Sequence, residues 1–264
     1  DAVKNIVDKY EAGACEVDTF CEANGLLNVR SSEPSRQWMN AVAAGETVVA
    51  RKGYLVEINA LWYNALKVAE KLTSGEASAK YGKMAEKCAK SFVEMFWSSE
   101  MNGLYDCVDA ETFKADRSIR PNQILAVSLP YSALSAEAAQ KVVRLCWNEL
   151  YTTYGLRTLT PHSDKFKGRC EGRADQRIKA RFRGMAWPWL LGEFMTAFLK
   201  CAPTRRDLCW AFIRPFHSHL RHGCLGSVAE LFDGTMPYRP SGNVLSAVSL
   251  GELLRVLHED LCKE

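Results

Sequence analysis

The sequence predicts a single all-α domain over residues 1–264. In most segments, apolar residues recur at the three- and four-residue spacing of an amphipathic helix. No convincing strand series and no sequence repeat accompany this pattern. Apolar residues make up 47% of the chain and charged residues 25%, proportions that provide a core and exclude a disordered or collagen-like chain.

The same apolar pattern places each helix. In the segment 56–73 the spacing holds as far as Leu72, and Gly75 ends the run. Ser135 begins the pattern of 135–150 and suits the start of a helix. Pro215 should kink or interrupt its own helix, because proline lacks an N–H group and crowds the preceding turn. The remaining helices are expected at 2–12, 77–97, 121–129, 187–200, 205–222 and 244–262.

Long connections separate these helices and hold most of the Gly, Pro and Arg residues. Simple bundles join helices by a few residues, whereas long ordered loops are usually functional. Long connections at regular intervals therefore predict helical hairpins stacked in a ring, with loops gathered over one end. These connections are 14–54, 98–120, 151–184 and 223–243.

Charge and hydropathy exclude two classes of partner. The 34 basic residues nearly balance the 31 acidic ones, so a formal charge of +3 gives no reason to expect nucleic acid. No apolar run approaches the roughly 18–20 residues of a membrane-spanning helix. The chain starts at Asp1 rather than at Met, which is compatible with a removed targeting segment or an upstream domain.

The ten cysteines and the histidines suggest neither disulfides nor a metal centre. There is no CxxC motif, and five cysteines lie in helix-like apolar runs, where Cys acts as a small hydrophobe. We therefore expect reduced thiols in a cytoplasmic protein without cofactor. His217, His219 and His222 do not share one helix face, so solvated surface positions are expected for them. The five cysteines are Cys88, Cys146, Cys201, Cys209 and Cys262.

Carboxylates beside aromatic residues are typical of carbohydrate sites. Glu57 precedes a series rich in Trp, Tyr and Asn, and Glu230 lies near Phe232 and Asp233. Aromatic faces pack on the C–H face of a sugar, and two carboxyls can act as acid and base at a glycosidic bond. A single Glu in a loop is more often a surface residue, and Trp at helical spacing is more often a core residue. These patterns alone leave both interpretations open.

Five ordered segments together resemble glycogen debranching enzymes, in particular their amylo-α-1,6-glucosidase domain. The first is VEINALWYNAL at 56–66. The others are RPNQ at 120–123 running on to Ser128-Leu129-Pro130, GLRTLTP at 155–161, WPWL at 187–190, and GSVAELFDG at 226–234. They span nearly the whole chain, so their combination is specific where one alone would be weak.

The resemblance implies an (α/α)6 toroid of the six-hairpin type and an inverting glucosidase that cleaves α-1,6-linked branch stubs on glycogen-like α-glucan. It places the general base on Glu230 and the general acid at Asn40, within Gln37-Trp38-Met39-Asn40, where the family has T-W-M-D. The implied sugar-site residues are Trp38, Asn59, Trp62, Asp106, Arg120, Asn122, Trp187, Trp189 and Asp233.

Several positions depart from the family pattern. An amide cannot donate a proton as a carboxylic acid does, so Asn40 weakens the catalytic assignment and leaves Glu57 as the nearest substitute in sequence. The family's Y-H-Q-G is Arg181-Phe182-Arg183-Gly184 here, which replaces a sugar-contacting His by Phe182. The family's G-R-D-T segment has no counterpart. From this resemblance we expect the chain to correspond to the C-terminal two-thirds of the catalytic domain, with an N-terminal glucan-binding domain belonging upstream of it.

Three functions remain open from the sequence. The first is hydrolysis of α-1,6 branches by a debranching-type domain. The second is a degenerate family member that binds α-glucan without cleaving it, favoured by Asn40 and Phe182. The third is an unrelated helical toroid such as a sugar epimerase, because fold does not fix function.

Overall fold

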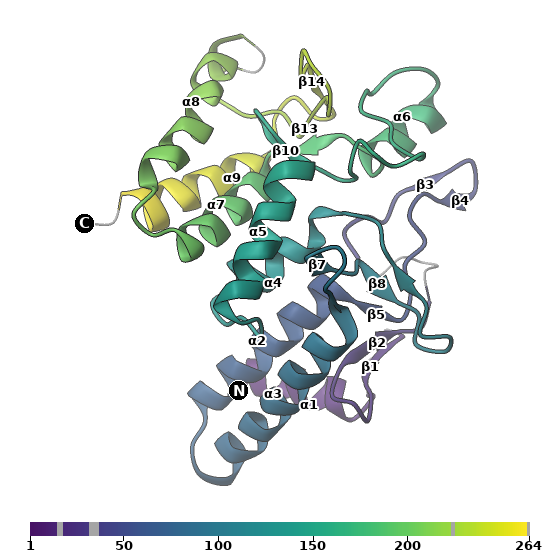
Figure 1. Cartoon of the computed structure of the whole chain (residues 1–264), viewed down its shortest axis with the longest axis vertical. Coiled ribbons are helices and arrows are strands. Elements are labelled where there is room, and N and C mark those ends of the chain that lie inside the picture. Colours follow the sequence, from purple (N-terminus) through teal and green to yellow (C-terminus); the bar gives the residue numbers. More distant parts are fainter. Residues whose placement is uncertain (15–17, 32–36, 223–224, 263–264) are drawn as a thin grey trace.

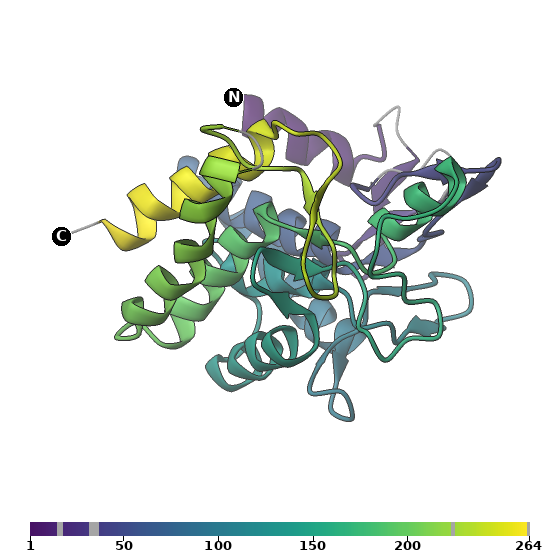
Figure 2. The same ribbon diagram turned by 90° about the horizontal axis from the view of Figure 1, so that it is seen from above.

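The structure is a computed structural model that describes residues 1–14, 18–31, 37–222 and 225–262. Helices other than α6 gather on one side of the molecule, while small strands and long loops gather on the other (Figures 1 and 2). A 3-10 turn, η1 (Pro121–Ile124), precedes α4, and a π-helical turn, η2 (Leu257–Leu261), continues α9. The helices are α1 (Ala2–Glu11), α2 (Val56–Leu72), α3 (Gly75–Phe96), α4 (Leu125–Ser128), α5 (Ala136–Leu150), α6 (Ala174–Arg181), α7 (Trp189–Cys201), α8 (Arg206–His222) and α9 (Ala247–Val256).

The helices pack as a row of hairpins. Helices α2 and α3 form the most extensive pair, α4 packs between α2 and α7, and α9 packs on α7. Helix α5 packs on α7 and α4 from outside this row. An amphipathic helix must bury its apolar face against another element, and here each of these helices does so against the next hairpin.

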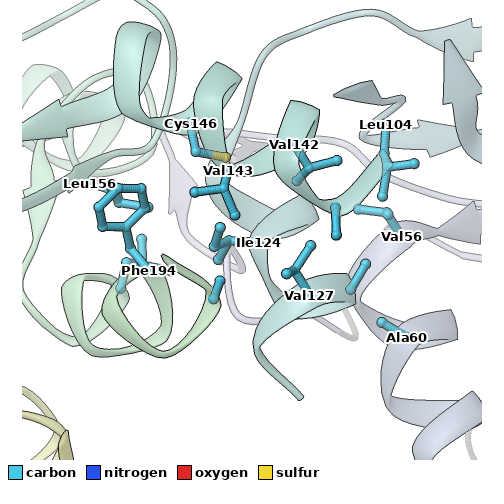
Figure 3. Close-up of a cluster of buried hydrophobic side chains, with 14 of the residues drawn as sticks. Val56, Ala60, Leu104, Ile124, Val127, Val142, Val143, Cys146, Leu156 and Phe194 are labelled. Atoms are coloured by element: carbon cyan, nitrogen blue, oxygen red, sulfur yellow. The ribbon is translucent and has the colours of Figure 1, made fainter. Parts of the chain in front are cut away.

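The core follows the contact between these hairpins (Figure 3). Val142, Val143 and Cys146 of α5 lie above Ile124 and Val127 in Figure 3, and all five are buried. Towards α7 the core becomes aromatic. There the Trp147 ring lies 5.3–5.8 Å, centroid to centroid, from the rings of Phe194, Phe198 and Phe212.

The loops contain small antiparallel sheets that hold the helix ends together. One sheet has the order β10-β11-β12-β13-β14, another the order β5-β8-β9, and three are two-stranded. The strands are β1 (Thr19–Cys21), β2 (Leu27–Val29), β3 (Val42–Ala43), β4 (Glu46–Thr47), β5 (Tyr54–Leu55), β6 (Trp97–Ser98), β7 (Gly103–Leu104), β8 (Cys107–Val108), β9 (Ala115–Asp116), β10 (Tyr151–Thr152), β11 (Gly155–Arg157), β12 (Ala186–Trp187), β13 (Leu231–Phe232) and β14 (Pro240–Ser241).

The helical prediction is confirmed for the long amphipathic helices and is wrong in two details. The domain is not wholly helical, because strands of two or three residues fill the long connections; such strands are too short to show a two-residue apolar period. Helix α6 was not expected, since its sequence ADQRIKAR has little apolar periodicity. Of the kink or interruption expected at Pro215, the interruption does not occur, because helix α8 continues through this residue.

The cysteines of the described residues are free thiols, and Cys88, Cys146 and Cys209 are buried as small hydrophobes. Burial raises the pKa of the Cys88 thiol to about 12, so this thiol stays protonated. Cys201 is half-buried and Cys262 exposed, in contrast to the core positions expected for them. Among the described residues, no helix is both long enough and apolar enough to span a bilayer.

Phe194 tests the aromatic core. Its side chain is fully buried among aromatic rings of α5, α7 and α8, so truncation leaves a cavity. We expect Phe194→Ala to lower the free energy of unfolding by about 3–5 kcal/mol in urea titrations. The matched control is Leu72→Ala on the exposed end of α2, which should stay within about 0.5 kcal/mol of the parent. Equal effects for both variants would contradict this core.

Candidate active site

Arg51 lies between the buried carboxylates of Glu57 and Asp106. Its Nη1 and Nη2 atoms donate hydrogen bonds to the two carboxylate oxygens of Glu57 at 2.5 and 2.7 Å. Its Nε forms an ion pair with Asp106 Oδ2 at 2.7 Å, and Nη2 donates to the Asp106 carbonyl at 2.9 Å. Although burial opposes it, Asp106 and Glu57 raise the pKa of Arg51. The buried cation is therefore held by both carboxylates together.

Asp106 joins this ion pair to the loop that follows β9. Its Oδ1 accepts a hydrogen bond from Asn122 Nδ2 at 2.7 Å, and Arg120 Nε lies 3.6 Å from its Oδ2. Arg120 Nη1 also donates to the carbonyls of Thr158 and Phe182, both at 2.9 Å. Burial raises the pKa of Asp106, and the two neighbouring guanidinium groups oppose that rise.

Asn122 in turn fixes an aromatic cluster. Its Oδ1 accepts a hydrogen bond from Trp38 Nε1 at 2.7 Å. The Trp38 ring then meets Phe182, Trp187 and Trp189 edge-on, with centroids 5.2–5.6 Å apart. The three tryptophans are half-buried, whereas Phe182 is buried. Part of each tryptophan ring therefore remains open to solvent.

Glu230 lies just before β13 with both carboxylate oxygens engaged. Oε1 pairs with Arg181 Nη2 at the end of α6, and Oε2 accepts the Asn243 N–H at 2.9 Å. The Arg181 guanidinium lies 5.7 Å from the Trp187 ring centroid, and its carbonyl accepts the indole N–H of that tryptophan at 2.9 Å. A Cβ at Gly242, where φ is +72°, would lie 2.5 Å from Glu230 Oε2, so the turn needs glycine.

Asp233 holds the loop between β13 and β14 in place. Its side chain is buried, its Oδ2 accepts from Arg239 Nε at 3.1 Å, and its backbone N–H donates to the Arg239 carbonyl at 2.9 Å. Arg239 also pairs with Glu171 at 2.5 Å. These contacts give Asp233 a structural role in the loop that carries Glu230.

Two residues expected at the sugar site are placed elsewhere. Asn59 is fully buried, and its amide exchanges hydrogen bonds with the Leu27 N–H and carbonyl at 2.7 and 3.1 Å. Trp62 is 3% exposed and donates its indole N–H to the Gly25 carbonyl at 3.1 Å. Both side chains therefore tie α2 to the β1–β2 hairpin. They are core residues rather than sugar-binding residues.

Glu57 and Asn40 occupy opposite environments. Glu57 is 2% exposed and gives both oxygens to Arg51, so it has no free oxygen for a leaving group. This geometry does not suit the role of substitute acid that the sequence suggested. Asn40, in contrast, is exposed and directly follows the buried Met39. An acid at position 40 would therefore be accessible to a substrate.

Within the described residues, one group of side chains has metal-type ligand atoms close together. Oxygen and sulfur atoms of Asp106, Cys107 and Asp116 lie within 4.8 Å of one another. Two guanidinium groups already neutralise Asp106, and burial raises the pKa of the Cys107 thiol to about 12. A cation would be repelled there, so we assign no metal to this cluster.

Sequence analysis did not predict Arg181 as a residue of the candidate site. It lies in a segment so rich in Arg and Lys that no single cation stands out. One feature of the sequence could have indicated Arg181: it lies directly before Phe182, in the segment that the resemblance aligns with the family's Y-H-Q-G. That position places it beside the glutamate of the GSVAELFDG segment once the chain is folded.

The sequence profile of the amylo-alpha-1,6-glucosidase family matches residues 1–255, which include every site residue described above. The chain belongs to this family. A comparison with curated proteins gives no sequence match.

Solved glycosidase structures share the fold of this amylo-alpha-1,6-glucosidase family member. Neutral trehalase from Saccharomyces cerevisiae superposes with a TM-score of 0.56 at 16% identity, over 77% of this chain and 37% of the trehalase. A GH63 mannosylglycerate hydrolase from Thermus thermophilus gives 0.56 at 14% identity, over 77% of this chain and 45% of that protein. A GH78 family rhamnosidase of a Bacillus species gives 0.53 at 14% identity, over 97% of this chain and 23% of the rhamnosidase.

These likenesses concern the fold alone. Trehalase and the GH63 hydrolase are (α/α)6 glycosidases, and the row of helical hairpins in this chain corresponds to part of that toroid. The chain spans less than half the length of each of the three structures.

His219 is buried against the loop that carries Glu230, in contrast to the solvated position expected for it. It is 7% exposed, and its Nε2 accepts the Ala229 N–H at 3.1 Å, directly before Glu230. Acceptance at Nε2 requires the neutral ring, and burial lowers the pKa of His219. His217 and His222 are exposed as expected.

Glu57→Gln should destabilise this family member strongly. The substitution keeps the shape of the side chain but leaves the Arg51 cation with one buried counter-charge instead of two. We expect a loss of about 3–5 kcal/mol in the free energy of unfolding, measured by urea titration. Glu111→Gln, an exposed site with the same chemical change, is the control and should be near neutral. A fully stable Glu57→Gln variant would show that the buried pair is not structural.

His219 should make stability depend on pH. In the unfolded chain its ring takes up a proton near the ordinary pKa of 6.5, whereas the folded chain resists protonation because its pKa is lowered. The free energy of unfolding should therefore fall as the pH drops below about 6.5, until the pH reaches the lower folded pKa. Urea titrations between about pH 7.5 and 5 should show a weaker slope for His219→Gln and an unchanged slope for the exposed control His217→Gln. Identical slopes in all three proteins would contradict this role.

Proposed function

We propose that this chain is an α-glucan-directed glycoside hydrolase domain that acts on α-1,6-linked glucosyl branches of glycogen-like substrates by inversion. The observation that carries this proposal is the placement of Glu230. Its carboxylate is partly exposed, is held on both oxygens, and is joined through Arg181 to the half-buried Trp187. The family match over residues 1–255 supports the glycosidic chemistry.

In this proposal Glu230 is the general base. Inversion needs a carboxylate that takes a proton from water on the face of the sugar opposite the leaving group. The ion pair with the guanidinium of Arg181 fixes the direction of the Glu230 carboxylate. Because Arg181 also occupies Oε1, water activation requires that this ion pair loosen when substrate binds.

The aromatic cluster is the proposed sugar platform. Trp38, Trp187 and Trp189 expose part of each ring, and a ring face can pack on the C–H face of a glucosyl unit. Asp106, Arg120 and Asn122 are too buried to contact a glucosyl ring that packs on these tryptophans. Their proposed role is to position Trp38 through the hydrogen bond from its indole N–H to Asn122.

A second function is binding of α-glucan without cleavage. Two observations favour it. Asn40 presents an amide at the exposed position where the resemblance places the acid, and Glu57 cannot substitute because Arg51 engages both of its oxygens. Leaving-group departure as an alkoxide is slow at neutral pH without a proton donor. The chain would then hold malto-oligosaccharides on the tryptophans.

Asn40→Asp distinguishes the two functions. The parent chain should bind maltotetraose in calorimetry but release glucose from a branched limit dextrin very slowly. A restored carboxylic acid should raise that rate by about 10²–10⁴, the usual contribution of general acid catalysis. Adding Glu230→Gln to the Asn40→Asp variant should remove the gained activity without changing maltotetraose binding, because the base acts in the transition state.

The outcomes separate clearly. Glucose release that depends on Glu230 in the parent or in Asn40→Asp supports the hydrolase. Binding without any release, even after Asn40→Asp, supports the binding function. Brisk release by the Glu230→Gln variant would remove Glu230 from the role of base. Absence of maltotetraose binding in every variant would contradict both functions.

A further inference from the structure

The positive charge of the chain is concentrated in one segment. Residues 164–183 contain eight basic and three acidic residues, a formal charge of +5, whereas the whole chain carries +3. This segment includes α6 and the loop before it. It lies next to the β3–β4 hairpin, on the side away from the long helices (Figures 1 and 2). The remainder of the chain is therefore slightly acidic, and an anion would be attracted to this side.

A cavity of about 710 Å³ opens beside this segment. Its walls come from 47–50, from the β9 region at 112–118, and from the loop between β11 and α6. Neither Glu230 nor a tryptophan of the aromatic cluster lines it, so the cavity is separate from the proposed sugar platform. The side chains of Thr112, Ser118 and Ser163 add hydroxyl groups. Its basic lining residues are Lys114, Arg117, Arg120, Lys165 and Arg183.

Several of these cations are not neutralised by the protein. Within the described ranges, Lys114 and Lys165 have no carboxylate partner, and Arg183 donates only to the Val48 carbonyl at 3.3 Å. Arg117 pairs with Glu100 on the surface. Unpaired cations that line one concave wall repel one another, and a bound anion would remove that repulsion.

Buried Arg120 supplies a second, independent indication. It lines the same cavity at 6% exposure, and its Nε lies 3.6 Å from Asp106 Oδ2, an ion pair that is too long for a hydrogen bond. The acidic lining residues are Asp109 and Asp116. Asp109 forms an ion pair with Lys52 at 3.1 Å, so Asp116 is the one described lining carboxylate that opposes the positive charge of the basic lining residues. A buried donor without an acceptor at hydrogen-bond distance costs free energy that a closer anionic oxygen can recover.

We propose that this cavity binds a phosphate monoester carried on a sugar. A phosphate monoester has close to two negative charges and three acceptor oxygens, which suits several cations with hydroxyl groups between them. The volume far exceeds that of a phosphate group and leaves room for the sugar ring that bears it. If the proposed function holds, the natural source is a phosphate ester on the glucan chain itself, read beside the branch-binding platform.

Calorimetry with four probes tests this proposal. The probes are inorganic phosphate, glucose 6-phosphate, a phosphorylated amylodextrin, and the same amylodextrin after phosphatase treatment. We expect glucose 6-phosphate to bind more tightly than phosphate, and the phosphorylated dextrin more tightly than its treated counterpart. Lys114→Gln/Lys165→Gln should weaken both phosphorylated ligands by about tenfold for each cation removed. Binding of the treated dextrin should not change.

The matched control is Lys167→Gln/Lys179→Gln, which removes the same charge from two positions of the basic segment 164–183 that do not line this cavity. An equal loss in the control would mean diffuse attraction to the segment and would overturn the site. No binding of glucose 6-phosphate to the parent chain at millimolar concentration would also overturn it. Binding of glucose 6-phosphate but of neither dextrin would retain the site and contradict the proposed function instead.

Discussion

The buried Arg51 guanidinium is the constraint on which the site depends. A cation at 1% exposure is stable only with its charge and its hydrogen bonds satisfied. Glu57 from the first turn of α2 and Asp106 before β8 satisfy it, so the start of a helix and the start of a strand must meet at one point. The pairing of β5 with β8 brings them there, with Tyr54 opposite Val108.

A series of single contacts leads from Asp106 to the aromatic cluster. Asp106 accepts a hydrogen bond from Asn122, Asn122 accepts one from Trp38, and the Trp38 ring packs edge-on against Trp187. Glu230 reaches the same cluster from the other direction, through Arg181 and Trp187. Elements far apart in sequence are thus joined by a series of hydrogen bonds and ion pairs between buried or half-buried polar groups. The aromatic cluster and the Arg181–Glu230 ion pair are therefore joined to each other through Trp187.

The long helices could be predicted because burial on one face repeats along their sequence, as in α2 and α5. Two-residue strands such as β12 and β13 leave no period to detect, and they form only because loops distant in sequence are packed side by side. Trp38, Asn122 and Trp187, which the resemblance assigns to one sugar site, do come together in the fold. The roles of Asn59, Trp62 and Glu57 were not predictable, because burial and hydrogen-bond partners depend on the tertiary fold.

Residues of the VEINALWYNAL motif and Asn40 differ in burial, and this decides what a substitution costs at each position. Glu57, Asn59 and Trp62 match the VEINALWYNAL motif, and all three are buried with their polar groups paired. Replacing such residues costs several kcal/mol, a large part of the stability of any domain. Asn40 is exposed, and an amide there costs almost nothing in stability. A domain of this kind can therefore change the residue at position 40 while its fold, and the VEINALWYNAL motif that supports the fold, stays intact.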